Sequence, residues 1–124
     1  MRPVRILLVE DNEVFRDALE LLLGMREDVA IVASVGDGAA AVSAAVEHRP
    51  DVVLMDYRLP GLDGIQATIQ VLEAVPEVAV VALTASADAA EREALVEAGA
   101  VACLAKDQEL EEIVAAILHA ASVA

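Results

Sequence analysis

The sequence predicts an α/β fold with a five-stranded parallel sheet and helices on both faces. Five short apolar runs alternate with segments of helical length along the 124 residues. Continuous short apolar runs are typical of parallel strands that are buried on both faces. Regular alternation of strands and helices indicates βαβ units, and right-handed crossovers leave few topologies. We therefore expect a single domain that spans residues 1–124.

Each predicted strand is one of the apolar runs. In chain order, the strands are expected at Val4–Val9, Val29–Val35, Asp51–Met55, Val78–Leu83 and Ala100–Ala105. The segments between and after them are expected to be helices, which cover Asn12–Met25, an alanine-rich stretch ending at Glu47, Ile65–Ala74, Ser86–Ala98 and a last segment after Asp107. Pro50 and Pro76 stop the helices before them, because proline lacks the backbone N–H that a helix needs.

Helix ends and buried faces are predicted from residue type and spacing. Asp63, Ser86 and Asp107 are expected N-caps, and Gly99 suits the residue after a helix. For the first helix we expect one apolar stripe to face the core, formed by Val14, Ala18, Leu21, Leu22 and Met25. For the last helix we expect the same of Leu110, Ile113, Val114, Ile117 and Leu118.

Composition excludes several classes of protein. The chain is 58% hydrophobic but only 2% aromatic, so Ala, Val and Leu must build the core. Its longest clean apolar run, Val78–Leu83, is far shorter than the ~20 residues of a membrane span, and no signal peptide is recognisable. With Cys103 as the one cysteine, no internal disulfide is possible, and we expect a cytoplasmic protein. A net charge of −14 argues against direct nucleic-acid binding by these residues.

Charged side chains follow three of the predicted strands, where each strand ends. Glu10 and Asp11 follow the first strand, Asp56 the third, and Lys106, the one lysine of the chain, the fifth. In open α/β sheets, ligands bind outside the carboxyl ends of the strands. Carboxylates gathered at one place repel each other unless a cation joins them. The pattern therefore indicates a divalent cation such as Mg²⁺, which prefers oxygen ligands.

The same edge is expected to carry a nucleophile, a positive charge and a hydroxyl group. A carboxylate such as Asp56 can attack a phosphoryl group and form an acyl phosphate. Lys106 supplies a point charge for a phosphoryl oxygen. Thr84 follows the fourth strand, and because Ser86 is the better helix cap, the Thr84 hydroxyl is available for another role.

Four segments together resemble the receiver domain of two-component response regulators. They are residues 7–12 (LLVEDN), 51–64 (DVVLMDYRLPGLDG), 82–85 (ALTA) and 99–107, which ends in Lys106-Asp107. The motifs occur in order, at family-like spacing, over nearly the whole chain. The Asp56 loop and the Lys106-Asp107 ending most resemble the receivers of NarL/FixJ-type transcriptional regulators. The resemblance implies the flavodoxin-like, doubly wound (βα)5 fold with strand order 2-1-3-4-5.

The resemblance also implies a role for each site residue. Asp56 would accept a phosphoryl group from a sensor histidine kinase. Asp11 and Asp56 would bind Mg²⁺ or Mn²⁺ directly, Glu10 would act through water, and the backbone carbonyl of Arg58 would be a further ligand. Lys106 would contact the phosphoryl group, and Thr84 would move toward it.

The family further implies an output. Such a receiver is a switch rather than an enzyme, although its site assists its own phosphotransfer and dephosphorylation. Phosphorylation would favour a homodimer, through the last helices, and would control transcription through a DNA-binding domain outside these 124 residues. No membrane partner is expected.

One residue departs from the family pattern. An aromatic residue usually lies three positions before the lysine, and its rotation follows the threonine. Here that position is Cys103, which cannot fill the space of a ring. We expect Cys103 to be a small, partly buried apolar residue. The usual coupling from Thr84 therefore has no aromatic ring to act on, and output would rely on shifts of the fourth and fifth strands.

Three other interpretations were weighed. A phosphatase of the haloacid dehalogenase type would need an acid–base aspartate two residues after Asp56, but Arg58 occupies that position and cannot release a proton near neutral pH. A flavodoxin-like flavin protein would place a phosphate after the first strand, where Glu10 and Asp11 would repel it. A degenerate receiver that acts as a constitutive interaction module stays open, although all the acidic, hydroxyl and lysine positions are present.

Overall fold

Five strands and five helices alternate along the chain. The structure is a computed structural model and describes residues 2–85 and 88–123. The strands are β1 (Val4–Val9), β2 (Val29–Val35), β3 (Val52–Asp56), β4 (Ala79–Thr84) and β5 (Ala102–Ala105). The helices are α1 (Glu13–Gly24), α2 (Gly38–His48), α3 (Gly64–Ala74), α4 (Ala89–Ala98) and α5 (Leu110–Val123). None of the described helices is long and apolar enough to cross a membrane.

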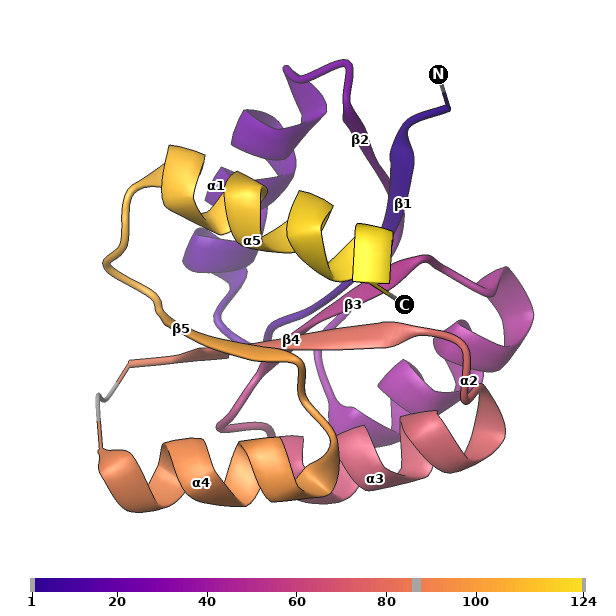
Figure 1. The fold of residues 1–124 in the computed structure, drawn as a ribbon, viewed down its shortest axis with the longest axis vertical. Helices are drawn as coiled ribbons and strands as arrows, with labels where there is room; N and C mark the ends of the chain where they lie inside the picture. Colours follow the sequence, from indigo (N-terminus) through magenta and orange to yellow (C-terminus); the bar gives the residue numbers. More distant parts are fainter. Residues whose placement is uncertain (1, 86–87, 124) are drawn as a thin grey trace.

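The strands form one parallel sheet in the order β2-β1-β3-β4-β5, so the predicted fold is confirmed. Helices α1 and α5 cover one face, and α2, α3 and α4 cover the other (Figure 1). Each face has its own apolar core, because successive strand residues point to opposite sides. In β1, Ile6 and Leu8 join the core under α1 and α5, whereas Leu7 and Val9 join the other.

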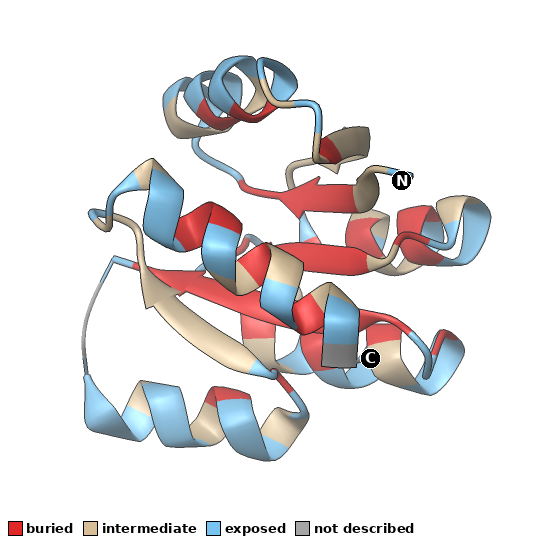
Figure 2. Ribbon diagram, turned by 45° about the horizontal axis from the view of Figure 1, so that its top comes forward, coloured by how far each residue is buried: buried red, intermediate tan, exposed pale blue. Residues whose placement is uncertain are grey.

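Burial on both faces explains the continuous apolar runs in the sequence. The central strands β1, β3 and β4 are almost wholly buried, whereas β5 at the sheet edge is half-buried throughout (Figure 2). Alanines of α2 and α3, such as Ala41, Ala45 and Ala67, are fully buried and bring these helices close to the sheet. Small side chains thus replace aromatic residues in this core.

One of the predicted helix caps, Asp63, is confirmed, and so is the helix-ending glycine Gly99. The side chain of Asp63 accepts a hydrogen bond from the Gln66 N–H at the start of α3. Gly99 ends α4 with φ of 116°, a left-handed conformation that favours glycine. The cap of α4 is Asp88, and Ser86, which the sequence offered for that role, lies outside the described residues.

The predicted cap of the last helix was wrong. Asp107 lies in a turn, and α5 begins at Leu110. The backbone carbonyl of Glu109 accepts the first helical hydrogen bond, from Ile113. Aspartate is a common turn residue as well as a common cap, so residue type alone cannot separate the two roles. The predicted apolar face of α5 is confirmed, since Ile113 and Ile117 are buried.

The predicted buried stripe of α1 was also wrong. Val14, Leu21 and Met25 are 81%, 69% and 75% exposed. The residues that α1 buries against the sheet are Leu19 and Leu23, which lie four positions apart. Helix α1 carries two neighbouring apolar stripes, and helical periodicity fits both. The stripe that packs on the sheet leaves the other as an exposed apolar surface.

Gly64, the first residue of α3, lies against the end of β3. A Cβ atom at this position would lie 2.5 Å from the Asp56 carbonyl oxygen and 2.7 Å from Tyr57 Cα. Both neighbours are backbone atoms that cannot move alone. Only glycine therefore lets α3 start this close to Asp56.

Substitution Gly64→Ala is expected to lower the free energy of unfolding by about 1–3 kcal/mol, because the added methyl group forces backbone apart. Chemical denaturation measures the change. Gly24→Ala is the matched control: its Cβ meets nothing within 4 Å, so it should be neutral or slightly stabilising at the end of α1. Equal unfolding midpoints for Gly64→Ala and the wild type would contradict the close packing.

Candidate functional site

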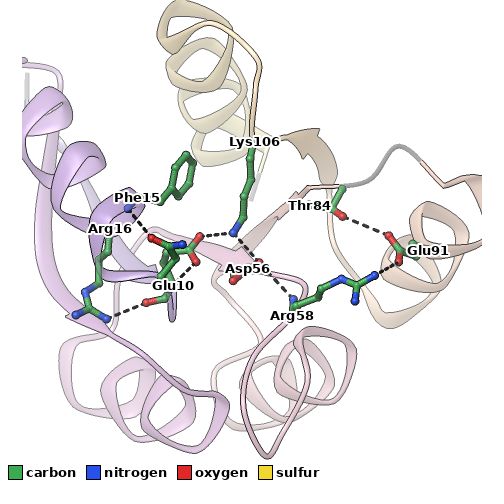
Figure 3. Close-up of polar contacts among 9 residues, drawn as sticks. Glu10, Phe15, Arg16, Asp56, Arg58, Thr84, Glu91 and Lys106 are labelled. Atoms are coloured by element: carbon green, nitrogen blue, oxygen red, sulfur yellow. Dashed lines mark hydrogen bonds and ion pairs between the residues drawn. The ribbon is translucent and has the colours of Figure 1, made fainter.

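The predicted site residues meet at the carboxyl edge of the sheet. Glu10 follows β1, Asp56 ends β3, Thr84 ends β4 and Lys106 follows β5. The register sets their alignment, because Val9 pairs with Met55 and Asp56 pairs with Leu83. Figure 3 shows the Lys106 side chain reaching across this edge to Glu10 and Asp56.

Three carboxylates form the acidic part of the site. Glu10, Asp11 and Asp56 each place one oxygen within 4.8 Å of the others. Asp11 is exposed, but Glu10 and Asp56 are only 0% and 2% exposed. Ionised carboxylates at this separation, with little water between them, repel strongly. The cluster therefore needs positive charge nearby.

Lys106 supplies that charge. Its Nζ lies 2.7 Å from Glu10 Oε1 and 3.2 Å from Asp56 Oδ1, as an ion pair with each. The same Nζ lies 5.0 Å from the ring centroid of Phe15, whose face favours a cation. Burial alone lowers the pKa of Lys106, but the hydrogen bond to Glu10 and the charges of Asp56 and Glu10 outweigh it, so the pKa is raised. Lys106 therefore stays charged.

One ammonium does not balance three carboxylates, and the excess charge appears at Asp56. Burial and, after it, the nearby Glu10 carboxylate raise the pKa of Asp56 to about 7, because the positive charge of Lys106 offsets only part of their effect. Near neutral pH, Asp56 is therefore divided between its protonated and ionised forms. A further cation at the cluster would favour the ionised form.

Backbone and side-chain donors hold Glu10 in place. The backbone N–H of Asn12 donates to Glu10 Oε2 at 3.0 Å, and Arg16 Nη1 donates to the Glu10 carbonyl at 2.9 Å. Figure 3 shows Arg16 on the α1 side of the cluster. The sequence analysis did not identify Arg16 or Phe15 as site residues. They are the fourth and third residues of α1, and their positions gave no signal, because only packing decides which helix side chains turn back toward the strand end.

Asp56 keeps one oxygen without a hydrogen bond. Oδ1 accepts a 3.3 Å hydrogen bond from the Arg58 backbone N–H and also faces Lys106, whereas buried Oδ2 has no hydrogen-bond partner among the described residues. Buried polar atoms are almost always satisfied, so an unsatisfied one indicates a bound ion, water or reacting group. The all-oxygen donor set fits a hard cation such as Mg²⁺.

Thr84 faces a residue that the sequence analysis did not single out. Its hydroxyl donates to Glu91 Oε2 on α4 at 3.3 Å, and its carbonyl accepts from the Lys106 backbone N–H at 2.9 Å. The second bond continues the pairing of β4 with β5 and fixes where Lys106 leaves the sheet. Thr84 is thus linked both to α4 and to the start of the Lys106 turn.

Arg58 and Cys103 lie at the margins of the cluster. The Arg58 side chain points away from Asp56 toward Glu91 (Figure 3). The ligand role of its backbone carbonyl stays a prediction. Cys103 is half-buried and packs against the core under α2, α3 and α4, and burial is the main cause that raises the pKa of its thiol. The description of Cys103 as a small, partly buried residue is confirmed, whereas its part in switching stays a prediction.

Comparison with known families identifies the chain. The family model of the response regulator receiver domain matches residues 6–118. The chain belongs to this family. Receiver domains are signalling modules, and the motifs from Glu10 to Lys106 that carried the resemblance all lie within the matched region.

The curated relatives of this receiver are bacterial proteins of more than one kind. The transcriptional regulatory protein LiaR of Bacillus subtilis is 36% identical over 114 residues, which are 92% of this chain and 54% of LiaR. A protein-glutamate methylesterase/protein-glutamine glutaminase of Nitrosospira multiformis is 39% identical over 88 residues, which are 71% of this chain and 24% of that protein. The chain therefore spans about half the length of LiaR and about a quarter of the length of the Nitrosospira protein.

Solved receiver structures share the fold throughout. The receiver domain of the putative response regulator NarL from Mycobacterium tuberculosis has a TM-score of 0.94 and 34% identity, and the match covers 98% of both chains. The receiver domain of a sensor histidine kinase from Pseudomonas aeruginosa has a TM-score of 0.85 and 36% identity, covering 97% of this chain and 98% of that one. The latter structure has a magnesium ion coordinated in its active site cleft.

Substitution Asp56→Asn is expected to stabilise the protein in the absence of divalent cations, by about 1 kcal/mol or more near pH 8 and much less near pH 4. A folded-state pKa of about 7, against an ordinary value of 3.8, means that the folded protein holds a proton that the unfolded chain releases. Stability is therefore lost as pH rises through this range, and asparagine, which has no charge, avoids the loss. Urea unfolding in EDTA at several pH values measures the effect.

Asp107→Asn provides the control for this pH series, because it makes the same chemical change at an exposed position. Its unfolding free energy should follow that of the wild type at each pH. If the unfolding free energies of Asp56→Asn and the wild type differed by the same amount at every pH, folding would not raise the pKa of Asp56.

Proposed function

We propose that this receiver is a phosphorylation-dependent switch in which Asp56 accepts a phosphoryl group from a sensor histidine kinase. The observation that carries the proposal is the buried Asp56 Oδ2, which has no hydrogen-bond partner among the described residues, beside the Lys106 ammonium and two further carboxylates. A nucleophile, a positive charge and cation ligands would thus be combined at the carboxyl edge of the sheet. Membership of the receiver family supports the same reaction.

In the proposed step, an ionised oxygen of Asp56 attacks the phosphorus atom. A new oxygen–phosphorus bond forms as the bond to the donor's histidine nitrogen breaks, and the electron pair of that bond stays on the nitrogen. Lys106, 3.2 Å from Asp56 Oδ1, is placed to contact a phosphoryl oxygen. Since the transition state carries its charge on phosphoryl oxygens, an ammonium at this place stabilises it.

Glu10, Asp11 and Asp56, with the Arg58 backbone carbonyl, are the groups that would hold Mg²⁺ or Mn²⁺. When bound, the metal ion supplies positive charge to the phosphoryl oxygens. The short distance among the three carboxylates supports this assignment. The magnesium ion in a solved receiver that is 36% identical to this chain supports it further.

After the transfer, the phosphoryl group would attract the Thr84 hydroxyl and shift the ends of β4 and β5. A ligand or modification shifts such an equilibrium only through its different interaction with the two states. Cys103 pairs with Ala82 across these strands, where its small side chain leaves the relay to the strands themselves.

For the output, we propose that residues 1–124 act as the receiver of a transcriptional regulator. Relatives that are named as transcriptional regulators, and of which the matched region is about half, support this role. DNA would be bound by a further domain rather than by these residues, whose net charge is −14. Phosphorylation would favour a homodimer through the last helices, and the receiver itself would be a switch rather than an enzyme.

Incubation with acetyl phosphate and Mg²⁺, followed by intact mass measurement, tests the proposed reaction. A single phosphoryl adduct is expected on the wild type, and none on Asp56→Asn or on the wild type in EDTA. Because Asp56→Asn keeps the shape of the side chain but removes the nucleophile, it also shows where the adduct forms. Folded wild-type protein that gains no adduct would contradict the proposal and favour a constitutive interaction module.

A further inference from the structure

Glu91 connects three segments beside the site. Its Oε2 accepts the Thr84 hydroxyl hydrogen bond at 3.3 Å, and its Oε1 lies 3.7 Å from Arg58 Nη2. The Glu91 side chain is only 15% exposed, whereas that of Arg58 is 75% exposed. One carboxylate on α4 therefore contacts the end of β4 and the β3–α3 loop (Figure 3).

The two residues that Glu91 contacts both lie next to Asp56 in the fold, because Thr84 follows Leu83, which pairs with Asp56, and Arg58 lies two residues after Asp56. In Figure 3, the Thr84 hydroxyl and the Arg58 guanidinium both point toward Glu91 and away from Asp56. A phosphoryl group on Asp56 would present oxygens that accept the same hydrogen bonds. Glu91 and the phosphoryl group therefore compete for Thr84 and Arg58.

The N-terminus of α4 has a cap other than the Glu91 carboxylate. Asp88 caps the helix and accepts hydrogen bonds from the backbone N–H groups of Ala90, at 2.7 Å, and Glu91, at 3.4 Å. Glu91 takes part in this cap through its backbone N–H. Because Asp88 remains, a change in the Glu91 side chain alters the contacts to Thr84 and Arg58 while the helix keeps its N-cap.

We propose that Glu91 is a positioning residue that holds Thr84 and Arg58 in their unphosphorylated arrangement and thereby limits phosphorylation of Asp56. This inference rests on the proposed phosphoacceptor function. Loss of the Glu91 carboxylate removes the Thr84 hydrogen bond and the Arg58 ion pair. Neither contact then has to break before Thr84 and Arg58 can bind the phosphoryl group. Glu91 thus opposes the phosphorylated arrangement. When Thr84 and Arg58 turn to the phosphoryl group, α4 loses its contacts to both residues.

The test compares Glu91→Gln and Glu91→Ala with the wild type in acetyl phosphate and Mg²⁺. Initial rates of adduct formation are followed by intact mass over a series of acetyl phosphate concentrations. We expect a rate about fivefold higher for both variants, which is a typical size for coupling between two sites. Glu93→Gln is the matched control, since it removes the same charge from an exposed position on the same helix and should stay within about twofold of the wild type.

A second background separates positioning from a general effect on folding or charge. In the double variant Thr84→Val/Arg58→Ala, the two partners of Glu91 are gone. Adding Glu91→Gln there should no longer raise the rate, whereas a structural or long-range electrostatic effect would persist. Urea unfolding of each variant confirms that the proteins compared are folded.

The outcomes separate this inference from the function on which it rests. An adduct on the wild type with equal rates for Glu91→Gln and Glu93→Gln overturns the role of Glu91 and leaves the phosphoacceptor function intact. A rate increase that survives in the double-variant background also overturns it. No adduct on any folded variant overturns both proposals.

Discussion

The ion pairs of Lys106 with Glu10 and Asp56 are the interaction on which the rest of the site depends. Without a cation, two buried carboxylates and an exposed third could not stay ionised within 4.8 Å of one another. The ammonium offsets part of the repulsion from distances of 2.7 and 3.2 Å. Burial, together with the remaining negative charge of Glu10, holds the pKa of Asp56 near 7, which leaves the site ready to gain more positive charge.

The sheet makes this arrangement possible because its interior is built almost wholly from aliphatic side chains. The central strands are buried on both faces apart from the first two residues of β1, and their buried polar residues, Asp56 and Thr84, lie where the chain leaves the sheet. Parallel pairing then brings the ends of β1, β3, β4 and β5 to one edge. Gly64, packed against the Asp56 backbone, lets α3 begin directly beside the site. Packing and chemistry are therefore linked at the same strand ends.

Strand positions, site edge and the residues of the acidic cluster could be predicted, because apolar runs mark buried strands and charged residues at their ends stand out. The strand order was predicted from the resemblance to receiver domains. The exposed stripe of α1 was predicted as buried, since Val14 and Met25 fit the helical period as well as Leu19 and Leu23 do. Asp107 was taken for a cap where the chain forms a turn. The contacts of Phe15, Arg16 and Glu91 depend on helix orientation, which leaves no local signal in the sequence. The exposed surface and the connection to α4 therefore needed the structure.

A carbon-13 NMR titration of the Asp56 side-chain carboxyl tests the central claim most directly. In protein free of divalent cations, the account predicts a midpoint at about 7, because burial and Glu10 together outweigh Lys106. Adding Mg²⁺ should move the midpoint well below that value, as positive charge favours the ionised form. A midpoint near the ordinary value of about 4, unchanged by Mg²⁺, would contradict the account, because the cluster would then carry no excess charge for a cation to neutralise.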